Sequence, residues 1–168
     1  MNTADSTRTL AHLFSELVDG VAAGGGGGFM LNTGDAGLLA SLDKLSADDA
    51  SRSSAGGATI AAHAQHVRYG LSLMNQWAAE GGNPFANARW DDAWKISRVD
   101  AGQWAEIRKG LGEETRGWLE TLKTPREVAT IEFTGMVASI AHLAYHLGAI
   151  RQINKDARGP REGTFDKL

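Results

Sequence analysis

Residues 134–154 read TGMVASIAHLAYHLGAIRQIN, and this stretch decides the fold. Apolar residues recur every three or four positions, which is the period of one helix face. The core positions predicted from that period are Val137, Ile140, Ala144, Leu147 and Ile150. The same helix carries two histidines one turn apart, so the segment that builds the core also presents a possible chemical site.

Three more stretches share this helical period, and we expect long helices over residues 4–22, 59–80 and 101–122. Thr59 begins one of them, and Asp100 with Gln103 forms the capping box of another, where Val99 and Trp104 are placed as a hydrophobic staple. A short helix is expected after Asp35, and it carries Leu38, Leu39, Leu42 and Leu45. Four long amphipathic helices without a convincing sheet predict an all-α four-helix bundle.

The connections are rich in residues that interrupt helices. Five glycines at 24–28 are expected to end the first helix near residue 22, and Ser and Gly at 51–57 make a second break. Residues 81–99 form a long crossover between the second and third helices, which argues against simple up-down connectivity. The β-branched stretch 128–133 could be extended. We expect one domain over residues 1–168, with 155–168 as a loose C-terminal tail.

Composition excludes several functions. The 168 residues carry a formal net charge of −3 and include no cysteine. Disulfides, zinc-thiolate sites and cysteine nucleophiles are therefore excluded, and any reacting thiol must arrive with a ligand. No basic stripe indicates a nucleic-acid partner. The N-terminal residues are polar and no apolar run looks long enough to cross a bilayer, so we expect no membrane partner and a cytoplasmic location.

Four of the five histidines fall in two pairs on two apolar helices. His142 and His146 are four residues apart, so they share a helix face and can chelate one ion. Neutral imidazole suits zinc, nickel, iron and copper. Their expected neighbours are Gly135, Ser139 and Ala149, which are small enough to leave room for water or a ligand.

The second pair, His63 and His66, could supply a third nitrogen from an opposing helix. The two lie about 60° apart around a helix axis, so geometry alone permits either. Three protein ligands with an open position is the catalytic arrangement of zinc. The alternative is that these histidines only form hydrogen bonds in the core, and for His12 we expect a surface position. The metalloprotease motif is absent, because Leu143 follows His142 where that motif has Glu.

The run from His142 to Gln152, HLAYHLGAIRQ, resembles the last-helix signature of the DinB-like superfamily of metal-binding four-helix bundles. Residues 59–67, TIAAHAQHV, resemble its second-helix signature, in which the ligand histidine follows a helix-starting Thr or Ser by seven residues. That resemblance selects His66, His142 and His146 as metal ligands. It implies up-down-down-up helix order, a nickel, zinc or iron ion, and a homodimer.

The resemblance also implies a range of activities. Some relatives transfer small thiols, and others isomerise maleylpyruvate with mycothiol. We therefore expect a metal-dependent small-molecule enzyme, either a thiol S-transferase or a hydrolase, with a low-molecular-weight thiol as a candidate cosubstrate. The alternative is a stress-related protein that binds a metal or small molecule without catalysis. The lack of a recognisable general base favours this non-catalytic alternative. No carboxylate falls on the histidine face, and no sequence pattern supports Tyr69 as an acid or base.

Overall fold

The helix starts follow the capping signals. In the computed structural model, which describes residues 3–24 and 28–160, α4 (Ile60–Glu80) begins after Thr59, whose hydroxyl accepts a hydrogen bond from the Ala62 amide. The reciprocal capping box of Asp100 and Gln103 begins α6 (Ala101–Lys123). The other long helices are α1 (Thr3–Asp19) and α7 (Thr130–Ile153). The predicted helical class is confirmed: the described part of the chain contains no strand, only one isolated β-bridge.

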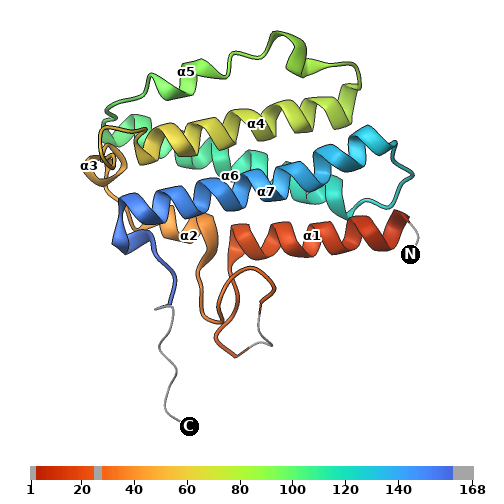
Figure 1. Cartoon of the computed structure of the whole chain (residues 1–168), viewed down its shortest axis with the longest axis horizontal. Helices are drawn as coiled ribbons and strands as arrows, with labels where there is room; N and C mark the ends of the chain where they lie inside the picture. Colours follow the sequence, from red (N-terminus) through yellow and green to blue (C-terminus); the bar gives the residue numbers. More distant parts are fainter. Residues whose placement is uncertain (1–2, 25–27, 161–168) are drawn as a thin grey trace.

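The long helices pack in a ring around one apolar core, in which α1 contacts α6 and α7, and α4 contacts the same two. Figure 1 shows α1 and α7 running in one direction and α4 and α6 in the other. The connection from α4 to α6 crosses the outside of α4 and includes η1 (Pro84–Asn87) and α5 (Asp91–Trp94). The largest fully buried side chains include Phe14, Leu17, Ile60, Trp104, Leu111, Trp118, Met136 and Leu143.

Short elements cover one end of the bundle (Figure 1). α2 (Gly37–Asp43) packs on α1, and α3 (Ala47–Ala50) is started by the capping box of Ser46 and Asp49. η2 (Lys155–Ala157) packs against α7 and buries Ala157 completely. The loose tail expected from residue 155 therefore does not begin there, and residues 161–168 lie outside the described residues.

The first helix ends earlier than predicted, at Asp19 instead of residue 22. Gly20 adopts a φ of +83°, and a Cβ there would lie 1.9 Å from the Asp35 carbonyl oxygen. Only glycine combines that left-handed backbone with so close an approach. Gly20 therefore ends the helix before the glycine run, of which residues 25–27 lie outside the described residues.

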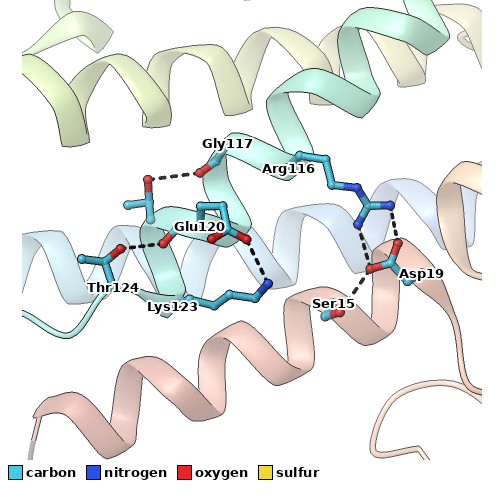
Figure 2. Close-up of polar contacts among 8 residues, drawn as sticks. Ser15, Asp19, Arg116, Gly117, Glu120, Lys123 and Thr124 are labelled. Atoms are coloured by element: carbon cyan, nitrogen blue, oxygen red, sulfur yellow. Dashed lines mark hydrogen bonds and ion pairs between the residues drawn. The ribbon is translucent and has the colours of Figure 1, made fainter.

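An ion pair joins the end of α1 to the middle of α6. Arg116 donates two hydrogen bonds to the Asp19 carboxylate, at 2.6 and 2.9 Å, as Figure 2 shows. These bonds lower the pKa of Asp19 and raise that of Arg116. Both side chains are substantially exposed, so a pair of this kind contributes at most about 1 kcal/mol.

Two expectations for α7 are wrong. The extended segment expected at 128–133 is absent, because the helix already begins at Thr130. Glu132 lies in the first turn of α7, where a negative charge stabilises the helix through its dipole, and its carboxylate pairs with Arg126. Val137, predicted to be core, is 45% exposed, and Met136 and Leu143 are buried instead.

By length and composition, α7 could span a membrane, and it is the one helix in the described ranges that could. The expectation that no apolar run is long enough is therefore wrong. A core helix passes the same test, and α7 packs against α1, α4 and η2.

Candidate metal centre

α4 carries two of the histidines near its start. Thr59 fixes that start twice, because its hydroxyl also donates a hydrogen bond to the Ile96 carbonyl at 2.8 Å. His63 and His66 follow on the first two turns, and both are buried. Thr59 therefore fixes where His63 and His66 lie along α4, and it also attaches the crossover segment to the start of that helix.

α7 presents the other pair toward α4. His146 is only 2% exposed, whereas His142 is half-buried. Gly70 of α4 faces His142, and a Cβ at Gly70 would lie 3.7 Å from His142 Cε1. The helices α4 and α7 therefore come together where both carry histidine.

Three imidazole nitrogens meet at this crossing. His142 Nε2 lies 3.1 Å from His66 Nε2 and 3.0 Å from His146 Nε2. The ligand atoms of the three residues all lie within 4.8 Å of one another. A tetrahedral zinc ion with bonds of about 2.0–2.1 Å would separate its nitrogens by roughly 3.3–3.4 Å. The group of His66, His142 and His146 can therefore bind a divalent metal ion.

The chemistry of the nitrogens favours a cation at their meeting point. A neutral imidazole has one N–H and one lone pair, so three converging nitrogens cannot all be satisfied by hydrogen bonds among themselves. A metal ion would accept all three lone pairs at once. His66 Nδ1 is buried without a hydrogen-bond partner, so His66 takes part in the cluster through Nε2.

The rings are held in the neutral form that metal binding requires. Burial, followed by the nearby histidines, lowers the pKa of His66 to about 4 and that of His146 to about 3. Burial also lowers the pKa of His142 and of His63. At neutral pH every ring therefore offers a lone pair.

His63 does not belong to this group of three histidines but lies behind His146. Its Nδ1 is 2.9 Å from Nδ1 of His146, on the opposite side of that ring from the converging Nε2 atoms. A ligand histidine is commonly oriented by a hydrogen bond to its second nitrogen. His63 can accept the Nδ1 proton of His146 and so keep the lone pair of His146 on Nε2.

Two tryptophans of the crossover complete the surroundings of His66. Trp94 stacks on the His66 ring at 4.3 Å between centroids, and Trp90 lies 5.6 Å away. The spacing of four between Trp90 and Trp94 puts both on one side of the short helix α5 (Asp91–Trp94), but it does not predict which helix they contact.

A pocket of about 900 Å³ opens beside the centre. His66 and His142 are among its lining residues, together with Gly135 and Ser139 as predicted. Ala149, the third small neighbour expected there, does not line the pocket. Ligands therefore have access to two of the three histidines.

Acid–base candidates are scarce around the centre. Among the described residues, no carboxylate lines the pocket. The Tyr69 hydroxyl accepts a hydrogen bond from the Arg89 amide, and Arg151 pairs with the buried Asp35. The Tyr145 ring lies 4.9 Å from His146 but is largely exposed. His12 is on the surface as predicted, where its ring packs on Phe29.

Comparison of the chain with protein-family models, curated proteins and solved structures gave no match.

Proposed function

We propose that this chain is a DinB-like protein that holds one divalent ion of zinc, nickel or iron with His66, His142 and His146. The observation that carries the proposal is the convergence of three neutral imidazole nitrogens from two helices. The helix directions in Figure 1 and the long crossover between α4 and α6 support the same family. In this proposal α7 is a core helix and the protein is cytoplasmic.

We propose further that the protein is an enzyme acting on a small molecule, as a thiol S-transferase or a hydrolase. A bound ion would supply a Lewis acid that lowers the pKa of water or of a thiol cosubstrate. His63 would hold His146 in the tautomer that leaves Nε2 free. The pocket beside His66 and His142 would orient the substrate and exclude bulk water.

The second candidate is a protein that binds a metal or small molecule without catalysis. It is favoured by one observation: among the described residues, the pocket has no carboxylate to act as a general base. An ion that lowers the pKa of a nucleophile reduces the need for such a base, so we prefer the enzyme.

Turnover measurements separate the two candidates. Protein reconstituted in turn with zinc, nickel or iron is given an uncharged nitrophenyl ester, or 1-chloro-2,4-dinitrobenzene with a small thiol. We expect one metal form to accelerate ester hydrolysis or displacement of chloride by the thiol, and His142→Ala to abolish the acceleration. Stoichiometric metal without acceleration of either reaction favours the binding protein.

We also propose a homodimer, which is supported by exposed apolar residues along α7. Ile131, Val137 and Tyr145 are 69%, 45% and 68% exposed. A second copy would remove such surface from water. Light scattering at micromolar concentration distinguishes a mass of two chains from that of one.

A further inference from the structure

The pocket beside the metal centre has an unusual chemical character. Its walls include the aromatic side chains of Trp77, Phe85 and Trp90, with Trp77 and Phe85 in edge-to-face contact at 5.7 Å. Aliphatic residues from α4 and α7 complete the walls: Val67, Leu71, Met74, Ile131 and Leu143. A ligand that reaches His66 and His142 must therefore lie against apolar surface.

Polar groups in the pocket are few and are neutral. Ser139 is already occupied, because its hydroxyl accepts a hydrogen bond from Trp118 Nε1 and donates one to the Met136 carbonyl. Apart from the histidines, no ionisable side chain lines the pocket within the described residues. A buried carboxylate without a partner is strongly disfavoured.

Glycines at the helix crossing create the room. A Cβ at Gly135 would come 2.8 Å from Trp77 Cζ3, so any side chain there would displace the indole. A Cβ at Gly70 would lie 3.6 Å from Trp90 and would narrow the pocket next to His142. The volume of about 900 Å³ lies in the range of sites for drug-sized ligands.

We infer that this site takes an uncharged, largely apolar molecule, aromatic or of similar bulk, with a metal-coordinating group at one end. The coordinating group lies toward His66 and His142, and the apolar body lies between Trp77, Phe85 and Trp90. A carboxylate held against the aromatic walls would have no charged partner among the lining residues, so ligands with a carboxylate on that body are disfavoured. This inference rests on the proposed metal centre for the coordinating end, while the apolar body is bound by the pocket alone.

The test compares three imidazoles by titration calorimetry on zinc-loaded protein: imidazole, 1-phenylimidazole and 4-(imidazol-1-yl)benzoate. Burial of one phenyl group is worth roughly a 10- to 100-fold gain in affinity. We expect 1-phenylimidazole to bind more tightly than imidazole by about that factor. The benzoate should lose most of the gain.

Matched variants locate the effect. Ala138 lines the pocket and is exposed, so Ala138→Trp fills the pocket without disturbing the core. Ala79→Trp places the same side chain at an exposed position of α4 that does not line the pocket. Ala138→Trp should bind imidazole with unchanged affinity but should no longer bind 1-phenylimidazole more tightly. Ala79→Trp should bind imidazole normally and should still bind 1-phenylimidazole more tightly.

Failure of the inference and failure of the metal proposal are distinguishable. Equal affinities for imidazole and 1-phenylimidazole, or tight binding of the benzoate, would overturn the inference while leaving the metal centre intact. If the protein takes up no zinc, the metal proposal fails, and quenching of tryptophan fluorescence in the metal-free protein decides the inference. If 1-phenylimidazole quenches the fluorescence saturably and Ala138→Trp abolishes that quenching, the apolar site is supported. If no saturable quenching occurs, the inference is overturned.

Discussion

Replacing His63 should weaken metal binding without abolishing it. His63 lies 2.9 Å from Nδ1 of His146 and is buried, yet none of the converging nitrogens belongs to it. Leucine at position 63 would keep the apolar packing and remove the hydrogen-bond acceptor. The His146 ring would then lose the contact that fixes its tautomer and orientation.

The size of the effect follows from the role of the contact. Loss of a hydrogen-bond partner behind a metal ligand typically costs about 10- to 100-fold in metal affinity. That corresponds to roughly 1.4–2.8 kcal/mol of binding free energy. Loss of His142, whose Nε2 contacts both other ligand nitrogens, should cost far more.

Competition against a chromophoric chelator measures the zinc affinity of each variant, and circular dichroism checks its helical content. His12→Ala serves as the control, because His12 is exposed and belongs to neither histidine pair. If His63→Leu binds zinc as tightly as the unaltered protein, the orienting role is wrong. If it loses zinc as completely as His142→Ala, His63 is itself a ligand.

The remaining predictions concern stability. Leu111 is fully buried, so Leu111→Ala should lower the free energy of unfolding by about 2–5 kcal/mol and the Tm by roughly 4–20 °C. Val137 is 45% exposed, so Val137→Ala should change the Tm little, and equal losses in the two variants would contradict the assigned core. Removing the metal ion with a chelator should leave the helical circular dichroism intact and lower the Tm. Loss of the helical signal would mean that the fold itself requires the ion. In the metal-free protein, the unfolded chain takes up protons near pH 6.5 while His66 and His146, with pKa values of about 4 and about 3, stay neutral. The Tm should therefore be constant above that pH and fall as the pH drops toward 4 and then 3, and a Tm independent of pH would show that the rings are not held neutral.

Much of the fold could be predicted because its signals are local. The caps at Thr59 and at Asp100 with Gln103 depend on a few adjacent residues, and both begin helices as expected. The buried face of α7 could not be read in the same way. That helix is apolar on nearly every side, so its period did not separate buried Met136 from exposed Val137.

The candidate site shows the same difference between what depends on one helix and what depends on the packing of several elements. The spacing of His142 and His146 is a property of one helix and was read directly. Whether His63 or His66 completes the group depends on the rotation of α4 against α7, which only packing determines. The position of Trp94 depends on the path of the crossover, and that segment has no helical period to reveal it.

Metal content is the most direct test of the centre. The protein is purified without added metal and analysed by inductively coupled plasma mass spectrometry, beside His66→Ala, His142→Ala and His146→Ala. We expect close to one divalent transition metal ion per chain, and each variant to lose most of it while retaining its helical dichroism. Variants that keep the metal content of the unaltered protein would contradict the assignment of the centre to these three histidines.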